Sequence, residues 1–396
     1  MLPFANLSGD AAQDYFADGV TESLTTDLSR ISGSFVIARN TAFTFKGKAI
    51  DAKEIGRQLG VRYVLEGSVQ RDPTHVRVNA QLIDAETGGH LWAERFDEPL
   101  SDLFALQDKL VAALASQLNA ELISSEARRA EHAPNPDSMD LYFQGVALLN
   151  KGFTPENMAQ ARGFFERAVA LDPDNLDAVL RKERIDTNLA SYQARGKDDL
   201  AAAYATAEAT VTHVLSLAPN NAYAHFEMGR TLINTNRRAE GMTELERALA
   251  LDPNFAWAQG EMGWAKILDG RAEEAEAYEK EALRLSPHDA EAYWWLGYIA
   301  DSKFYLGKYE EALAWYRRCI EISRNWPLAH LHFAADLELL GRHDEARAEA
   351  QTGLAFSPKF TIHTWRVGTS PSDNPVYRQQ KERLMQAMQR AGVPEQ

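Results

Sequence analysis

The second half of the chain repeats one short motif, in which an apolar residue stands two positions before a proline. The motif occurs at Pro173, Pro219, Pro253, Pro287 and Pro358. The intervals between these prolines are 46, 34, 34 and 71 residues, and the longest divides into 37 and 34 if another unit ends near Arg324. A period of about 34 residues indicates stacked helix pairs, because each pair buries its apolar face only against its neighbours.

Small residues recur inside these units where the two helices of a pair must approach closely. If each ending is position 32, small residues fall at positions 8, 20 and 27, as in Gly229, Gly241 and Ala248. This pattern resembles the tetratricopeptide repeat. The resemblance implies an all-α solenoid of about six repeats over residues 138–358. Its inner helices would line a concave surface that binds a partner and seldom carries chemistry.

The second unit departs from the pattern. Its inner helix, predicted over residues 178–192, carries Arg181, Lys182, Glu183 and Arg184 where small or apolar residues belong. The unit is also 12 residues longer than the 34-residue period, since its proline follows the previous one by 46 residues. We therefore predict a longer helix pair or a protruding loop in this unit.

The pattern stops after Pro358. Residues 359–376 are predicted to form a loop, and residues 377–391 an amphipathic helix that ends at Gly392. Solenoids need a polar outer surface at their last repeat. We therefore predict that residues 359–396 form a C-terminal loop and a capping helix.

Residues 1–123 read as a separate small α/β domain, with helices packed on a small mixed sheet. Asp18 and Asp51 are predicted to cap the N-termini of two helices, and Gly60 to end the second one. The first residues, 1–4, are predicted to be the end of a buried strand. A strand this short is unusual in a sheet, so we expect the native polypeptide to extend further upstream.

Three predicted strands follow, over residues 63–70, 76–82 and 91–96. The middle strand alternates apolar and polar residues, which indicates a sheet with one wet face. The connections between the strands are short and rich in turn residues, which favours an antiparallel meander. A long helix is predicted from Ser101 onward, and the polar residues 124–137 are predicted to be a linker.

Five segments of the first domain resemble the TolB amino-terminal-like domain. They are residues 2–10, 15–19, 35–40, 63–69 and 91–95, in chain order. The resemblance covers residues 2–123 and implies a domain that stands between an N-terminal output domain and tetratricopeptide repeats in bacterial proteins. The output domain in such proteins is commonly a class III adenylate cyclase or a winged-helix DNA-binding domain.

The charge balance disfavours several classes of function. The net charge of −15 divides into −6 over residues 1–134 and −9 over the rest, and no basic stripe interrupts the acidic balance. Neutralising phosphates requires clustered Lys and Arg, so we expect this chain to bind neither nucleic acid nor an anionic membrane. No apolar run in the sequence approaches the length of a bilayer-spanning helix.

The sequence motifs that carry catalysis are absent. There is no phosphate-binding glycine–lysine loop, no zinc-binding histidine pair with a glutamate between, and no glycine-flanked nucleophilic serine. His330 and His332 are two positions apart and so point to different helix faces, which disfavours a metal site. We predict no catalytic, cofactor-binding or metal-binding residues, and no enzyme activity for this chain.

Aromatic residues and one arginine recur at the inner-helix positions that face the groove in the tetratricopeptide family. They are Tyr223, Phe226, Arg230, Trp257, Trp264, Trp294 and Tyr298. Aromatic rings with an arginine at the rim are typical of a peptide-binding surface. The alternative is that these rings pack between neighbouring inner helices or against the N-terminal domain.

Two functions fit this pattern. The first is a non-catalytic regulatory and protein-interaction region of a bacterial signalling protein, with a protein or peptide partner in the repeat groove. The alternative is a fragment of a class III adenylate cyclase whose catalytic domain lies upstream. A free-standing scaffold, and a homo-oligomer, stay open. The expected location is the cytoplasm, or the periplasm if a transmembrane helix precedes the chain.

Overall fold

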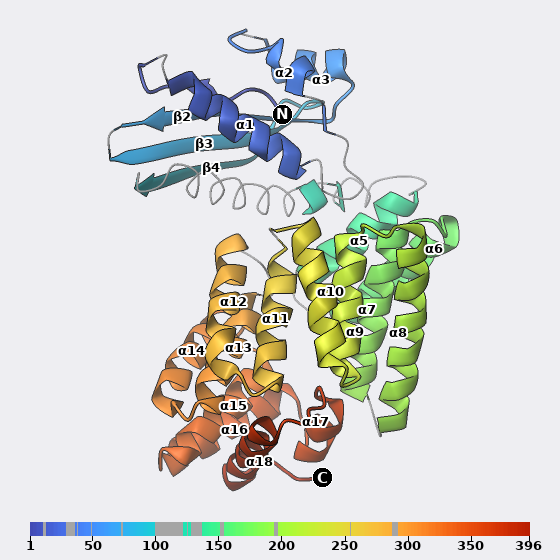
Figure 1. Ribbon diagram of the computed structural model, residues 1–396, viewed down its shortest axis with the longest axis vertical. Helices are drawn as coiled ribbons and strands as arrows, with labels where there is room; N and C mark the ends of the chain where they lie inside the picture. The colour runs from blue at the N-terminus through green and yellow to red at the C-terminus, as the bar shows by residue number, and fades with distance from the viewer. Residues whose placement is uncertain are drawn as a thin grey trace. The chain divides into compact units, whose positions relative to one another are not determined.

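The chain, in a computed structural model, divides into two compact units, residues 1–143 and 144–396 (Figure 1). The structure describes residues 1–10, 13–28, 36–37, 39–48, 50–72, 74–99, 122–124, 126–127, 137–150, 154–193, 197–253, 255–286 and 292–396. The helix predicted from Ser101 and most of the predicted linker lie outside the described residues. Within the described residues, a mixed sheet near the N-terminus is followed by a helical solenoid, which confirms the predicted fold class.

The first unit contains a four-stranded sheet in the order β1-β2-β3-β4. The strands are β1 (Ala5–Asn6), β2 (Tyr63–Arg71), β3 (His75–Asp84) and β4 (His90–Pro99). β1 runs parallel to β2, and the other three strands form the predicted antiparallel meander. Along β3, buried Val76, Val78, Ala80 and Leu82 alternate with less buried residues, which confirms the single wet face.

In the part of the first unit that the structure describes, the helices α1 (Asp14–Leu28), α2 (Arg39–Phe43) and α3 (Ala52–Leu59) accompany this sheet. Asp51 caps α3 by accepting a hydrogen bond from the amide of Lys53, and Gly60 ends it with a left-handed φ of 63°, as predicted. The predicted cap Asp18 is wrong, because it lies inside α1. The helix begins one turn earlier at Asp14, whose charge suits the helix N-terminus.

Six helix pairs follow within the described residues, each with an inner helix and then an outer helix. They are α5 (Ser138–Asn150) with α6 (Pro155–Leu171), α7 (Leu176–Gln193) with α8 (Lys197–Leu217), α9 (Ala222–Asn234) with α10 (Arg238–Leu251), α11 (Ala256–Leu268) with α12 (Ala272–Leu285), α13 (Ala292–Tyr305) with α14 (Tyr309–Ile322), and α15 (Pro327–Leu339) with α16 (His343–Phe356). From α6 to α16 each helix packs against the one that follows it in the chain.

The predicted small residues stand where two helix backbones touch. A Cβ atom on Gly229 would lie 2.9 Å from the carbonyl oxygen of Gly241, and one on Gly241 would lie 2.7 Å from the carbonyl oxygen of Gly229. Only glycine allows α9 and α10 this approach. The turn inside the fourth pair is made by Gly270, whose φ of 76° disfavours a side chain.

The second pair is longer than its neighbours, as its sequence predicts. α7 has 18 residues and α8 has 21, compared with 13 and 14 in α9 and α10. The extra length extends the helices on both sides of residues 194–196, which lie outside the described residues.

The C-terminal region contains one helix that was not predicted. Residues 362–368 were predicted to be loop but form α17 (Ile362–Gly368), because Thr361 and Thr364 cap the helix reciprocally. The predicted amphipathic helix exists as α18 (Pro375–Arg390). α18 packs mainly against the inner helix α15 of the last pair and also contacts α13, and its role as a cap stays a prediction (Figure 1).

None of the helices that the structure describes is both long enough and apolar enough to span a bilayer.

Candidate functional site

The seven residues predicted for the groove lie on three successive inner helices. Tyr223, Phe226 and Arg230 are on α9, Trp257 and Trp264 are on α11, and Trp294 and Tyr298 are on α13. Phe226 is fully buried and Arg230 is nearly so, whereas the other five are partly exposed. Phe226 is therefore a packing residue, and the partly exposed five are the ones that a partner could reach.

Three of these aromatic residues form a continuous chain of ring contacts, of which one is a parallel stack. The ring of Trp264 lies 5.1 Å from that of Tyr298 at an interplanar angle of 18°, and Tyr298 lies 6.0 Å from Trp294. Trp294 continues the contact to Trp326 at 4.7 Å, at the start of α15. The rings thus pack between neighbouring inner helices and keep part of their surface accessible.

Two arginines from the irregular helix α7 stack on the remaining aromatic residues. The guanidinium of Arg181 lies 4.5 Å from the ring centre of Tyr223, and that of Arg184 lies 4.3 Å from the ring of Trp257. A guanidinium over a ring face is attracted by the ring's negative face, more strongly where water is excluded. Neither arginine was predicted as a site residue, although their occurrence at inner-helix positions was the available signal.

Carboxylates lie among these guanidinium groups. Arg230 donates from Nε to Glu227 at 3.0 Å and from Nη2 to the hydroxyl of Thr187 at 2.7 Å. Burial raises the pKa of Glu261 to about 7, and the nearby Arg230 and Arg184 only partly oppose this rise. The inner faces of α7, α9 and α11 therefore combine aromatic rings with partly desolvated charges of both signs.

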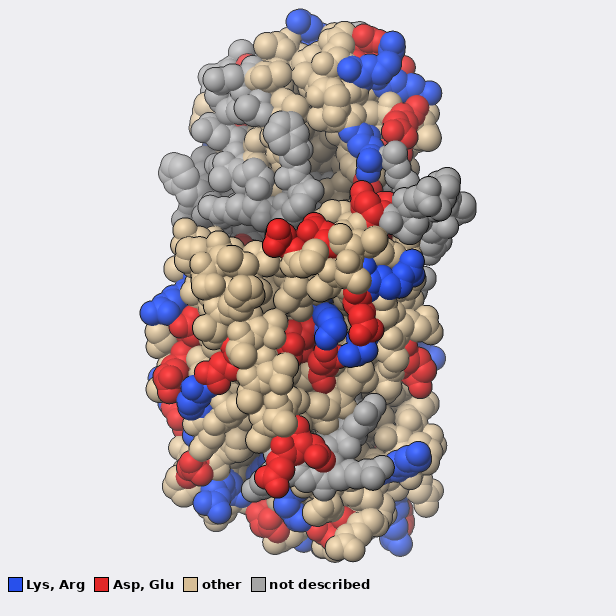
Figure 2. Space-filling view, turned by 90° about the vertical axis from the view of Figure 1, so that its right-hand side faces the viewer, with Lys and Arg blue, Asp and Glu red and all other residues tan. Residues whose placement is uncertain are grey.

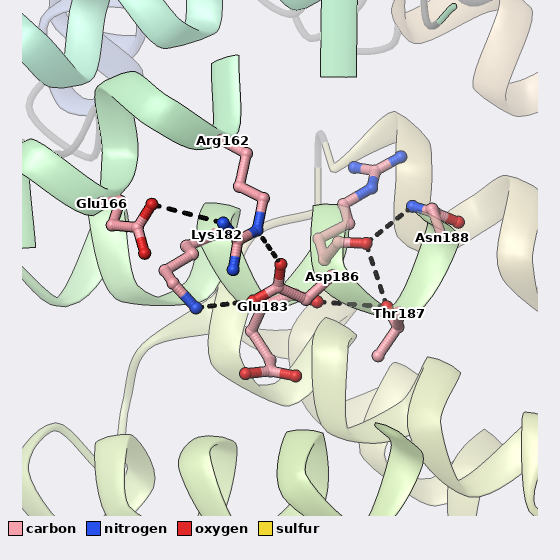
Figure 3. A network of polar contacts seen from close by, with 8 residues as sticks. Arg162, Glu166, Lys182, Glu183, Asp186, Thr187 and Asn188 are labelled. Carbon is pink, nitrogen blue, oxygen red and sulfur yellow. Dashed lines mark hydrogen bonds and ion pairs between the residues drawn. The ribbon is translucent and has the colours of Figure 1, made fainter. Parts of the chain in front are cut away.

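Other charges of α7 bind the preceding pair (Figure 3). Arg162 on α6 donates from Nε to Asp186 at 2.5 Å, and the ammonium of Lys182 lies 2.5 Å from the other oxygen of Asp186. Arg162 also pairs with Glu166 at 3.2 Å. Asp186 thus ties α7 to α6 through Arg162, while Lys182 pairs with Asp186 within α7.

The histidines considered as metal ligands have separate structural partners. His330 bonds to Glu349 at 2.5 Å and to the carbonyl oxygen of Arg324 at 2.8 Å, whereas His332 bonds to Asp301 at 2.9 Å. They therefore point to different faces. Among the described residues, no group of three or more His, Cys, Asp or Glu side chains is placed to hold a metal ion.

One carboxyl group is buried in the core of the fourth pair. Glu279 on α12 is fully buried, and its oxygens have no hydrogen-bond partner within the described parts of the chain. In the third and fifth pairs, Leu245 and Tyr316 occupy the same repeat position. Burial raises the pKa of Glu279 well above its ordinary value, and the carboxylates of Glu261 and Asp301 raise it further. The neutral form is therefore favoured.

The C-terminal region covers part of the inner face. The indole Nε1 of Trp264 donates to the hydroxyl of Ser370 at 3.2 Å, and its ring meets that of Tyr377 edge-on at 6.5 Å. One of the predicted groove residues is therefore already in contact with the chain's own C-terminal segment.

The exposed charges of the helix pairs are mixed in sign (Figure 2). Many belong to ion pairs three residues apart on one helix, such as Arg271 with Glu274 at 2.6 Å and Arg284 with Glu281 at 2.6 Å. Exposed pairs of this kind contribute little to stability. Acidic and basic groups stand side by side on the visible face.

Helix pairs with a period of 34 residues and an aromatic inner face define a helical repeat protein of the solenoid class. Sequence models of the tetratricopeptide repeat match residues 199–261 and 290–325, which confirms that these repeats are present. The assignment of residues 2–123 to a TolB amino-terminal-like domain stays a prediction.

One curated relative is "Putative adenylate cyclase 3" of Rhizobium meliloti (strain 1021). It is 46% identical to this chain over 175 residues, which cover 44% of this chain. The chain spans 30% of the length of that relative.

Solved structures of repeat proteins are similar in fold. A thermophilic TPR protein of Thermus thermophilus is 18% identical with a TM-score of 0.40, over 50% of this chain and 98% of that one. Human IFIT1 with m7Gppp-AAAA is 18% identical with a TM-score of 0.48, over 64% of this chain and 58% of that one. The Cut9–Hcn1 hetero-tetramer is 15% identical with a TM-score of 0.47, over 68% of this chain and 49% of that one.

Proposed function

We propose that this chain is the non-catalytic regulatory and protein-interaction region of a bacterial signalling protein, and that its repeats bind a protein or peptide partner. The observation that carries this proposal is the stacking of Arg181 on Tyr223 and of Arg184 on Trp257. Tyr223, Trp257 and Arg181 are partly exposed, whereas Arg184 is buried beneath the ring that it contacts. Tryptophan, tyrosine and arginine are the residue types that dominate binding energy at protein interfaces.

The charges of the same surface favour a peptide over a nucleic acid. Glu227 and Glu261 lie among the arginines of the inner face, so the basic groups are already opposed by carboxyl groups. Phosphate binding relies on cationic groups that are free to neutralise it. The expected ligand is therefore a protein segment with polar and apolar side chains, and we expect no cofactor.

Site-specific photo-crosslinking tests this function. A benzophenone side chain placed at Trp257, on the inner face, should crosslink one protein of defined mass in cells that express the full chain. The matched control is Glu246, an exposed residue of the outer helix α10. Equal crosslinking from both positions, or crosslinking from Glu246 alone, would show that the inner face does not bind the partner.

A second candidate is a fragment of a class III adenylate cyclase whose catalytic domain lies upstream. The identity of 46% with the Rhizobium meliloti relative favours it. Reading the coding sequence upstream of Met1 in frame separates the possibilities. A cyclase domain supports this candidate, a winged helix supports a transcription regulator, and a transmembrane helix would move the chain from the expected cytoplasm to the periplasm.

The activity assay for this candidate uses two proteins. The longer polypeptide should form cyclic AMP from ATP with Mg²⁺ or Mn²⁺, and the present chain should form none. Activity of the present chain alone would contradict its non-catalytic role. No activity in a longer polypeptide that contains an intact cyclase domain would contradict the cyclase reading.

A further inference from the structure

Residues 363–374, which we call the strap, lie between two buried anchors. At one end, Ile362 is fully buried and its amide donates to the carbonyl oxygen of Pro394 at 2.9 Å. At the other end, Tyr377 is buried and its ring stacks on that of Tyr305 at 5.0 Å. The strap therefore begins and ends at fixed points on the solenoid (Figure 1).

The strap crosses several helix pairs between these anchors. At Gly368 its backbone approaches α7 so closely that a Cβ atom would lie 2.8 Å from the carbonyl oxygen of Ser191. Six residues later, the side-chain amide of Asn374 donates to the carbonyl oxygen of Asp269, at the end of α11, at 2.8 Å. The strap thus passes from the second pair to the fourth.

Ser370 makes the first of three side-chain contacts to the inner helices. Its hydroxyl donates to the side-chain oxygen of Asn234 at 2.7 Å and accepts from the indole Nε1 of Trp264 at 3.2 Å. One hydroxyl group therefore joins the C-terminal end of α9 to an aromatic residue of α11.

Ser372 and Asn374 make the other two contacts. The hydroxyl of Ser372 donates to the carbonyl oxygen of Leu268 at 2.7 Å, next to the carbonyl of Asp269 that Asn374 binds. Carbonyl groups at a helix C-terminus lack partners within the helix and attract donors. Ser370, Ser372 and Asn374 alternate along the chain, as expected when one side of an extended segment faces its binding surface.

Two further hydrogen bonds hold the strap in the same position. Arg238 donates to the carbonyl oxygen of Pro371 at 3.1 Å, and the side-chain amide of Asn236 donates to the carboxylate of Asp373. Asn236 lies in the turn between α9 and α10, and Arg238 is the first residue of α10. The inner surface therefore offers acceptors from α11 and donors from the neighbouring turn and helix start, which together match an extended polar peptide.

The strap is held less firmly than its anchors. His363, Arg366, Pro371 and Asp373 are exposed, and polar contacts attach residues 369–374, whereas Trp365 and Val367 of α17 pack against the solenoid. In contrast, α18 buries Leu384, Met385, Ala387 and Met388 against the solenoid. Segments with few buried apolar contacts open locally, while the surrounding core stays folded.

We propose that the surface formed by Asn234, Trp264 and the carbonyl groups of Leu268 and Asp269 is a recognition site for an extended peptide with hydroxyl or carboxamide side chains at alternate positions. The strap is the intramolecular competitor for this site. The inference rests on the proposed function, because it names the ligand chemistry and the regulation of the same inner face.

The test uses the full chain and a fluorescein-labelled peptide with the sequence of residues 366–376. Two variants weaken the strap and leave the site intact, namely Ser372→Ala and Asn374→Asp. Aspartate keeps the N-cap of α18, which the side-chain oxygen of Asn374 provides, and loses the donor to Asp269. The matched control is Gln386→Ala on the exposed side of α18.

Loss of one hydrogen bond should increase the open fraction of the strap about fivefold. Because apparent affinity scales with the fraction of open sites, each weakened variant should bind the peptide about fivefold more tightly than the parent chain. Hydrogen exchange in α17 should accelerate about fivefold in both variants, while exchange in α18 stays unchanged. Gln386→Ala should match the parent in every measurement.

Three results would overturn the proposal. These are equal peptide affinity in all four chains, absence of binding in a variant whose α17 exchanges faster, and exchange of α17 only together with α18. The crosslinking test of the proposed function does not use the peptide. If a partner crosslinks at Trp257 and any of these three results is obtained, the proposal about the strap is refuted and the proposed function is not.

Discussion

Replacing Glu261 by glutamine tests whether the inner face of the solenoid holds a carboxyl group at an energetic cost. Burial raises the pKa of Glu261 from an ordinary value of 4.5 to about 7. Each pH unit of this difference corresponds to about 1.4 kcal/mol, so the charged form costs about 3 kcal/mol in the folded state. Glutamine has nearly the same shape and carries no charge, so it removes this cost.

The sign follows from proton binding in the two states. Below about pH 4.5 Glu261 is protonated in both the folded and the unfolded state, so its titration does not change the free energy of unfolding. Between pH 4.5 and about 7 the unfolded chain loses this proton and the folded chain keeps it, so the free energy of unfolding falls as pH rises. Above about pH 7 the full cost is present.

Chemical denaturation of the parent chain and Glu261→Gln over pH 4 to 8.5 measures this difference. The variant should equal the parent near pH 4 and exceed its free energy of unfolding by about 3 kcal/mol at pH 8.5. Glu246→Gln, at an exposed position, should show no difference. If Glu261→Gln is less stable than the parent at pH 8.5, then Arg184 and Arg230 hold the carboxylate charged, and the reasoning fails.

Four further substitutions, one of them a matched control, test the packing of the solenoid. Glu279→Leu should raise the free energy of unfolding at pH 7 by about 1–3 kcal/mol, because it removes a buried polar group without partners; denaturant titration that shows a loss would contradict this. Trp294→Ala should lower the free energy of unfolding by about 3 kcal/mol if the main role of Trp294 is packing on Trp326. An unchanged thermal midpoint together with weaker partner crosslinking would assign Trp294 to binding instead. Gly229→Ala should cost about 1–3 kcal/mol because its Cβ meets a backbone carbonyl. Gly163→Ala adds a Cβ atom with no neighbour within 4 Å and should stabilise the same protein by about 0.5–1 kcal/mol. Equal effects of Gly229→Ala and Gly163→Ala in thermal melts would refute the close approach of α9 and α10.

The fold could be predicted where the sequence signal is local or periodic. The spacing of the proline endings located the helix pairs, and the apolar alternation of Val76, Val78 and Ala80 predicted the wet face of the sheet. Errors arose where two local signals compete. Asp18 and Asp14 both suit a helix start, and only the packed structure shows that the helix begins at Asp14.

The inner face was only partly predictable for a different reason. The repeat period placed the predicted aromatic residues on inner helices, because their positions recur in every unit. The partner of Trp264 is Ser370, which is 106 residues away in the chain. The apolar face of α18 was visible in the sequence, but this face could have packed against any exposed apolar surface of the solenoid. No periodic signal connects a unique C-terminal segment to a particular repeat.

Tethering determines what a partner must do to replace the strap. A segment fixed at both ends has an effective concentration on the order of millimolar at its own site. A free peptide that makes only the strap's contacts would therefore need a similar concentration to compete. To bind at about micromolar concentration it must gain three orders of magnitude, or about 4 kcal/mol. Trp257, partly exposed beside Arg184 on the same helix as Trp264, is an aromatic group able to supply this, because one buried aromatic hot spot contributes about 2–4 kcal/mol. A partner that covers both Trp257 and the strap site would displace the strap without any loosening of α18.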